Sequence, residues 1–150
     1  MRDLIAKIFI VLSIAGFAAT SFADEAEHVI KYRKNVMSAN GAHMSAAALI
    51  VQGKASFSGD LVGHAQVLAT TLSKVESLFP EGSDFGDTRA KDNVWSKPAE
   101  FKKVAKDAAD AAAEFLKVVK AGEKAGYAKT FSALADACKA CHKDFRTEKE

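Results

Sequence analysis

Residues 127–146 read YAKTFSALADACKACHKDFR. The functional and apolar side chains of this stretch recur at steps of three and four positions, at Leu134, Cys138, His142 and Phe145. That spacing puts them on one face of an α-helix. Alanine, the strongest helix former, fills much of the remainder. The stretch therefore predicts an amphipathic helix from about Tyr127 to Arg146.

Three further segments show the same periodicity, and we expect helices from about Glu25 to Gln52, from Ser58 or Asp60 to Phe79, and from Ser96 to Gly122. Ser96 is the expected N-cap of the third segment, with Pro98 in its first turn. Between them, Pro80 to Lys97 is rich in Gly, Ser, Asp and Asn and forms one long connection. The pattern predicts an all-α fold, an antiparallel four-helix bundle made by a single domain of residues 24–150.

The first predicted helix has its expected core positions at Val29, Val36, Met37, Met44, Ala47 and Val51. Many of the core positions in all four helices are alanine. An alanine-rich bundle has little aliphatic volume of its own, so a bulky apolar cofactor between the helices would complete its core.

The N-terminus carries Arg2 and Lys7, then an apolar run from Ile8 to Ala19, then small residues at Ser21 and Ala23. This order is typical of a secretory signal peptide, so we predict that residues 1–23 are removed and that the mature protein is periplasmic. A short membrane-anchoring helix is the alternative, but the run is shorter than the roughly 20 residues that cross a bilayer. We expect no stable membrane anchor.

The chain has 150 residues and a formal net charge of +2, without a block of Lys and Arg. A chain so close to neutral offers no basic patch for phosphate groups, so we expect no nucleic-acid binding. Partners should be proteins or small ligands.

Residues 138–142, CKACH, match the C-x-x-C-H attachment sequence of haem c. Cys138 and Cys141 can each form a thioether with a haem vinyl group, and His142 projects from the same helical face to bind iron. We therefore predict one covalent haem c per chain. Three alternatives are a thiol–disulfide couple, a zinc site and a structural disulfide. The first requires a helix N-terminus, the second lacks ligands with suitable spacing, and the third is strained within one helical turn.

The sequence resembles the class II c-type cytochromes, the cytochrome c′ family. The resemblance rests on the haem site close to the C-terminus, on Tyr32-Arg33 and Met37 in the first helix, on Trp95, and on Phe145-Arg146 after the haem histidine. It covers nearly all of the predicted mature chain and implies a four-helix bundle with haem c between the helices.

The resemblance also implies roles for individual residues. Arg33 would meet a haem propionate, with Lys34 beside it, and Thr88 and Arg89 would lie where the connection approaches the haem edge. A guanidinium suits this role because it stays protonated and matches a carboxylate in shape. Met37 corresponds to the residue that faces the iron opposite His142. It either ligates the iron, as in low-spin members, or only packs against it, as in five-coordinate cytochromes c′.

Two functions follow from these alternatives. With Met37 as ligand, the protein would carry electrons to and from redox partner proteins. With an open position, it would bind nitric oxide or carbon monoxide. A thiol oxidoreductase without haem is the third hypothesis. We see no base or nucleophile constellation and expect no enzyme. The resemblance further implies a homodimer through the first two helices. The three remaining histidines are expected at the surface or at interfaces, or as a sixth iron ligand: His28, His43 and His64.

Overall fold

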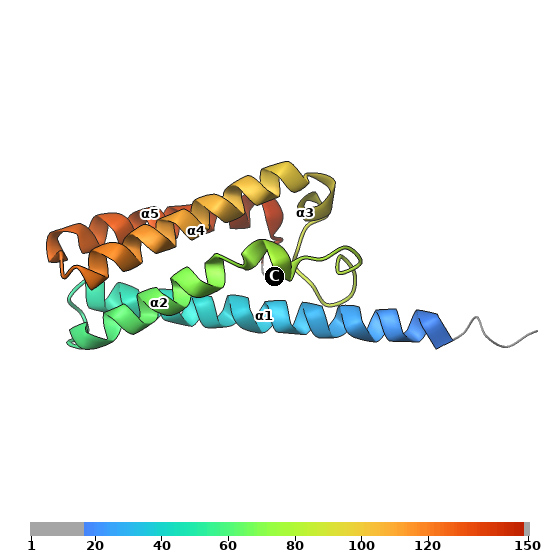
Figure 1. Ribbon diagram of the computed structural model, residues 1–150, viewed down its shortest axis with the longest axis horizontal. Coiled ribbons are helices and arrows are strands. Elements are labelled where there is room, and N and C mark those ends of the chain that lie inside the picture. Colours follow the sequence, from blue (N-terminus) through green and yellow to red (C-terminus); the bar gives the residue numbers. More distant parts are fainter. Residues whose placement is uncertain (1–16, 149–150) are drawn as a thin grey trace, which may run out of the picture.

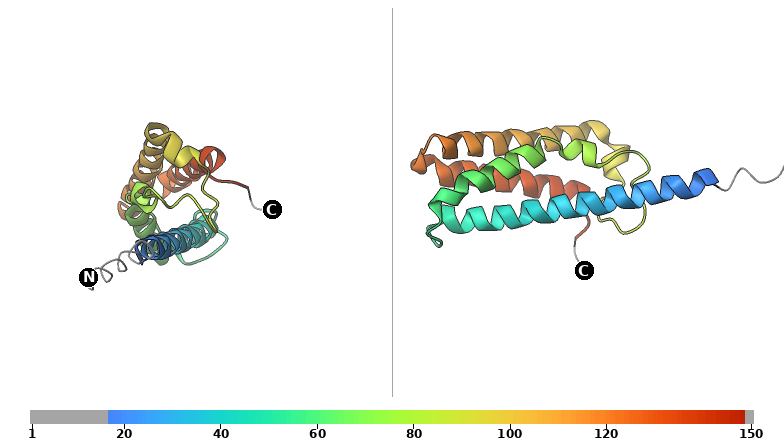
Figure 2. Two further views of the ribbon diagram at one scale, coloured as in Figure 1. Left: turned by 90° about the vertical axis from the view of Figure 1, so that its right-hand side faces the viewer. Right: turned by 60° about the horizontal axis from the view of Figure 1, so that its bottom comes forward.

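The computed structural model describes residues 17–148, with side chains from Glu25 onward. Four long helices run antiparallel to their neighbours (Figures 1 and 2): α1 (Phe17–Val51), α2 (Leu61–Leu72), α4 (Pro98–Lys120) and α5 (Lys124–Phe145). The predicted antiparallel four-helix bundle is confirmed. The predicted signal peptide lies mostly outside the described residues, and the side chains of residues 17–24 lie outside them too.

Three short elements complete the described chain: the 3-10 turns η1 (Ser58–Asp60) and η2 (Val75–Leu78), and the one-turn helix α3 (Asn93–Ser96). The second predicted helix is therefore interrupted at residues 73–74 before it continues as η2. The expected cap at Ser96 is wrong, because Ser96 closes α3 and its hydroxyl donates to the carbonyl of Asp92. Lys97 precedes α4 instead, and Pro98 begins that helix as predicted.

The main core lies where α1, α2, α4 and α5 meet. Its members are buried almost completely, and they include Leu61, Ala65, Leu68, Ala112, Phe115 and Leu134. Each buried leucine or phenylalanine contributes about 1.5–3 kcal/mol to folding. A second cluster of Val94, Phe101 and Phe145 lies at the end of the bundle where residues 79–97 connect η2 to α4. Ala105 and Ala108 of α4 line a cavity in this part of the bundle, and their small side chains leave room for it.

The inward face of α1 carries two polar side chains that the apolar pattern did not identify. Ile30, Arg33, Asn40 and Ala47 are buried at steps of three, seven and seven residues, so they lie on one stripe. Asn40 Oδ1 accepts a hydrogen bond from the Thr71 hydroxyl of α2, at 2.6 Å. The expected core positions Val29 and Val36 are only half-buried, because the stripe lies one position away from them.

None of the helices in the described part of the chain is long and apolar enough to cross a membrane.

Candidate haem site

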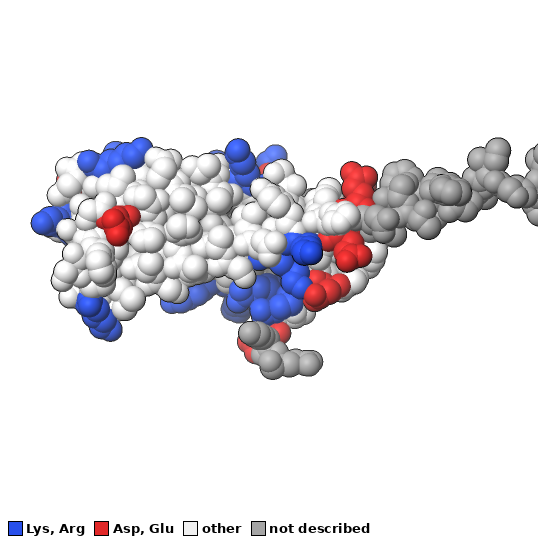
Figure 3. All heavy atoms as spheres, turned by 90° about the horizontal axis from the view of Figure 1, so that it is seen from below, with Lys and Arg blue, Asp and Glu red and all other residues white. Residues whose placement is uncertain are grey.

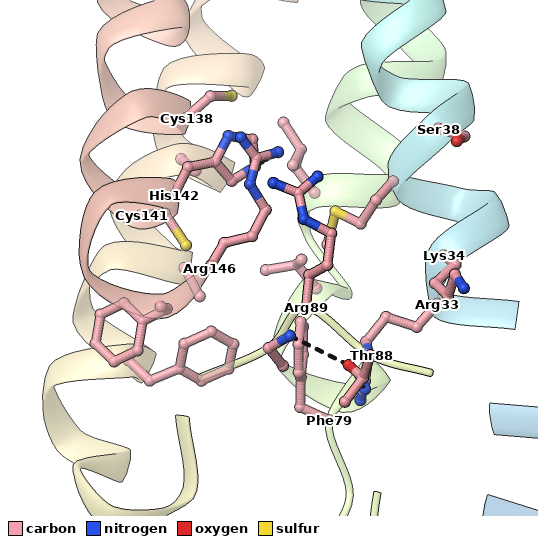
Figure 4. Close-up of a pocket in the computed structure, with 18 of the residues that line it drawn as sticks. Arg33, Lys34, Ser38, Phe79, Thr88, Arg89, Cys138, Cys141, His142 and Arg146 are labelled. Carbon is pink, nitrogen blue, oxygen red and sulfur yellow. Dashed lines mark hydrogen bonds between the residues drawn. The ribbon is translucent and has the colours of Figure 1, made fainter. Parts of the chain in front are cut away.

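Helix α5 brings the three residues of the C-x-x-C-H motif to one cavity. Cys138, Cys141 and His142 follow one another along the helix face that lines it (Figure 4). The cavity has a volume of about 410 Å³ and lies between α1, α2, α4 and α5. This volume falls within the range of cofactor and ligand pockets in proteins, roughly 300–1,000 Å³. The fold therefore provides a site of suitable size beside the motif.

The interior of the cavity is apolar and its rim is charged. Interior side chains come from four elements and include Leu72, Val75, Phe101, Ala105, Ala108 and Phe145. The eight site residues predicted from the sequence all line this one cavity: Arg33, Lys34, Met37, Thr88, Arg89, Cys138, Cys141 and His142. An apolar interior with cationic residues at one edge matches the chemistry of a haem, which has an apolar ring and two carboxylates. The residues present fit the cofactor.

Burial disfavours the charged forms of the motif residues. It raises the pKa of the Cys138 thiol, and burial together with the neighbouring Cys138 raises the pKa of Cys141 to about 11. Reactive redox cysteines need a lowered pKa, so these thiols are unlike those of a thiol–disulfide couple. The pKa of His142 is lowered, first by burial and then by the charges of Arg146 and Arg89. His142 is therefore favoured in the neutral form that can ligate a metal.

Arg33 is buried at 3% exposure and binds the crossover, the connection of residues 79–97. Its Nη1 donates to the Leu78 carbonyl at 3.2 Å and to Ser83 Oγ at 3.0 Å. Its Nη2 donates to the Ser83 carbonyl at 3.0 Å and to Thr88 Oγ1 at 2.8 Å. The guanidinium also lies over the Phe79 ring, 4.5 Å from its centroid. Arg33 thus fixes the crossover against α1.

The other end of the crossover is bound to the last turn of α5. The Lys91 amide donates to the Phe145 carbonyl at 3.0 Å, and the Lys91 ammonium donates to the Lys143 carbonyl at 2.8 Å. The Asn93 side chain donates to the Asp144 carbonyl at 3.3 Å. These donors satisfy carbonyls that a helix end leaves without partners. The crossover therefore connects α1 to the end of the motif helix, an arrangement that no local sequence signal predicts.

Two further arginines project into the cavity beside His142 (Figure 4). Arg146 Nη1 lies 3.5 Å from His142 Nε2. Arg89 donates to the Thr147 carbonyl through Nε, at 3.1 Å, and through Nη2. Their like charges lower the pKa of Arg146, although burial is the larger cause. Such a concentration of positive charge favours an anionic group at this edge of the cavity.

Across the described residues, no group of three or more His, Cys, Asp and Glu side chains could hold a metal ion.

An antiparallel four-helix bundle whose last helix directs C-x-x-C-H into an apolar cavity defines a haem-binding c-type cytochrome. Comparison with known proteins leads to the same class of protein. The sequence profile described as Cytochrome C' matches residues 28–146. Cytochrome c' of Pararhodospirillum photometricum is 38% identical over 121 residues, which are 80% of this chain and 97% of that protein. The chain belongs to the cytochrome c′ family, whose members carry covalently bound haem c.

Solved structures show the same fold. The crystal structure of cytochrome c' from Rubrivivax gelatinosus has a TM-score of 0.75 and 30% identity, and the match covers 79% of this chain and 94% of that one. A nitric oxide complex of a mutant cytochrome c prime from Alcaligenes xylosoxidans has a TM-score of 0.76 and 26% identity, with 83% of this chain and 97% of that one covered.

Proposed function

We propose that this protein holds haem c in the α1–α2–α4–α5 cavity and binds nitric oxide or carbon monoxide at its iron. Cys138 and Cys141 would supply the two thioether bonds and His142 an axial nitrogen ligand. The haem would supply the iron at which a diatomic gas binds or an electron is held. The chain's own residues hold the ring, exclude water and set the charge around it. This is a binding function without substrate turnover.

The observation that carries this proposal is the apolar wall that α1, α2 and η2 contribute to the cavity. Met37 of α1, Leu72 of α2 and Val75 of η2 line the cavity there. None of them offers a charge or a strong hydrogen-bond donor, so this wall admits small uncharged molecules more readily than anions. The nitric oxide complex of the Alcaligenes xylosoxidans relative supports the same ligand class.

Electron transfer is the second candidate, because Met37 brings a thioether to the cavity from α1. Direct ligation by Met37 would close the sixth position and raise the haem potential. The protein would then exchange electrons with redox partner proteins instead of binding gases. The two functions differ in one property, the ligand opposite His142.

The test is the absorption spectrum of the dithionite-reduced holoprotein before and after carbon monoxide is added. A broad high-spin spectrum that shifts with the gas supports gas binding, and Met37→Leu should leave this response in place because it preserves volume. Sharp bands that do not respond in the wild type, but do respond in Met37→Leu, would establish ligation by Met37 and electron transfer. Met44→Leu is the matched control, since Met44 is half-buried on the same helix but packs against the main core.

We further propose that the haem propionates lie at the charged rim, near Arg33, Lys34, Thr88 and Arg89. The Nη atoms of Arg33 already bind the crossover. Its contribution would therefore be its Nε together with its positive charge. Lys34 pairs with Asp87 across the rim, and both side chains are largely exposed. Such an exposed pair is weak, so a propionate could replace Asp87 as the partner of Lys34.

Two proposals concern the setting of the protein. Export to the periplasm rests on the predicted signal peptide of residues 1–23.

A homodimer through α1 and α2 is supported by uncharged stretches of the chain in and next to these helices: residues 37–52 and 61–72 contain no Asp, Glu, Lys or Arg. Figure 3 shows charged side chains gathered toward the middle and one end of this face, while the other half carries basic side chains around its margin and an acidic group on its otherwise uncharged face. Light scattering should give a dimer that Leu49→Lys converts to a monomer, and a monomeric wild type would refute it.

A further inference from the structure

Two histidines outside the haem cavity meet across the junction of α1 and α2. His43 Nδ1 and His64 Nδ1 lie 2.8 Å apart, with ring centroids 5.1 Å apart and ring planes inclined by 58°. Both side chains are half-buried. Neither residue lines the haem cavity. The pair is thus a separate cluster of metal-ligating groups, held by two of the long helices.

The separation of the two nitrogens suits two ligand positions on one metal ion. Zinc–imidazole bonds are about 2.0–2.1 Å long, so two nitrogens on one ion lie about 2.9 Å apart at a right angle and about 3.3 Å apart at the tetrahedral angle. The observed 2.8 Å is close to the shorter of these distances and about 0.5 Å below the tetrahedral one, so the two rings must also move slightly apart to bind zinc. A modest rotation about χ2, a soft torsion in histidine, would turn both lone pairs toward one ion.

Metal binding can replace the hydrogen bond between the two rings without a change in their total number of protons. In the hydrogen bond between two neutral imidazoles, one Nδ1 carries the proton and the other accepts it. Binding of an ion requires both Nδ1 atoms to be unprotonated, so the proton of the donor moves to its own Nε2. Each ring then remains neutral, and no net proton is released. The hydrogen bond is replaced by two metal–nitrogen bonds.

The two helices that carry the pair contribute no cationic side chain near it. No Lys or Arg occurs in residues 37–51 of α1 or in residues 61–72 of α2. A cation from α4 does lie close to α2, because the Lys120 ammonium donates to Gln66 Oε1, two residues after His64, at 2.8 Å. The exposed carboxylate of Asp60 lies four residues before His64, one turn away along the chain. The described residues contain no third ligating side chain that would complete a cluster of three. Water would therefore occupy the remaining positions at this partly exposed pair.

We propose that His43 and His64 form a two-imidazole site for a divalent first-row transition-metal ion, of the class of Zn²⁺ and Cu²⁺. Imidazole is a preferred ligand of these ions. The helices hold the two rings in contact before the ion arrives, which reduces the cost of ordering them. An ion here would join α1 to α2 on the face that we assign to the dimer, independently of the haem.

The test is isothermal titration of ferric holoprotein with Zn²⁺ alone, because zinc cannot change the oxidation state of the haem. We expect one ion per chain, or one per two chains if paired copies share it. His43→Ala and His64→Ala should each weaken binding by at least about tenfold, since even partners outside the ligand shell contribute 10- to 100-fold to metal affinity. The double variant should lose little more than either single variant, because both residues serve one site.

His28→Ala is the matched control. His28 is exposed on the same helix, 15 residues before His43, which is about 22 Å along the axis. This variant should bind zinc as the wild type does. An unchanged haem spectrum shows that each variant is folded. Equal affinity in the wild type and both single variants, or loss of binding in His28→Ala, would overturn the proposal. The heat of zinc binding does not depend on the ligand opposite His142, so this test and the carbon monoxide test fail independently.

Discussion

Replacement of Arg33 by alanine tests whether this buried side chain holds the crossover in place. The change removes a guanidinium that is 3% exposed and that makes four hydrogen bonds to residues 78–88. The Ser83 hydroxyl keeps its bond to the Pro80 carbonyl, and Thr88 Oγ1 keeps the bond from the Ala90 amide. The carbonyls of Leu78 and Ser83 are the groups that lose a charged donor.

The expected magnitude follows from these losses. A hydrogen bond from a charged group contributes about 1.5–3 kcal/mol, and two carbonyls are affected. The contact with the Phe79 ring adds about 0.5–2 kcal/mol. Relief of guanidinium burial, which already lowers the pKa of Arg33, offsets part of this sum. We expect the free energy of unfolding of the holoprotein to fall by about 3 kcal/mol.

Urea denaturation followed by circular dichroism measures this loss. Lys34→Ala is the control: it also removes a contact to the crossover, but the Lys34 and Asp87 side chains are 46% and 92% exposed, so the loss should stay below about 1 kcal/mol. Arg33→Lys should recover little, because one ammonium cannot reproduce the fork of the guanidinium. A loss for Arg33→Ala no greater than that for Lys34→Ala would refute the assignment of Arg33 as the anchor.

Three further predictions concern the core, the helix end and the thiols. Phe115→Ala should cost about 3–5 kcal/mol in urea denaturation because Phe115 is 0% exposed, whereas Phe57→Ala, at 67% exposure, should stay within about 0.5 kcal/mol; similar losses would contradict the core assignment. Lys91→Ala with Asn93→Ala should speed hydrogen exchange in the last turn of α5, and unchanged exchange would show that the crossover does not stabilise it. In protein made without haem attachment, Cys141 should be alkylated slowly at pH 8, because a pKa of about 11 leaves only about one thiol in a thousand as thiolate. The alkylation rate should rise about tenfold for each pH unit. Fast alkylation at pH 8 would contradict this prediction.

The long helices were predictable because their signals are local. Apolar residues at helical spacing define α1, α2, α4 and α5, and Pro98 marks the start of α4 within two residues of the prediction. The cap at Ser96 was wrong because a serine before Pro98 is also compatible with the end of a separate short helix. No glycine or proline marks the break at residues 73–74, so the sequence predicted a continuous helix there.

That the predicted residues share one cavity could be expected from the sequence, but their contacts could not. The C-x-x-C-H motif locates Cys138, Cys141 and His142 without any structure, and the family resemblance adds the residues of α1 and the crossover. The bonds of Arg33 to Ser83 join residues 50 positions apart, and such pairings depend on the crossover path, which carries no periodic signal. The His43–His64 contact is likewise set by the packing of α1 on α2, across 21 residues.

Mass spectrometry of the intact protein, purified after coexpression with the haem-attachment machinery and unfolded in the presence of a thiol reagent, tests the central claim most directly. We expect a chain that carries the mass of one haem after denaturation, with neither Cys138 nor Cys141 available to the reagent, and no retained haem in Cys138→Ser/Cys141→Ser. A haem-free mass with two reactive thiols in the wild type would contradict it.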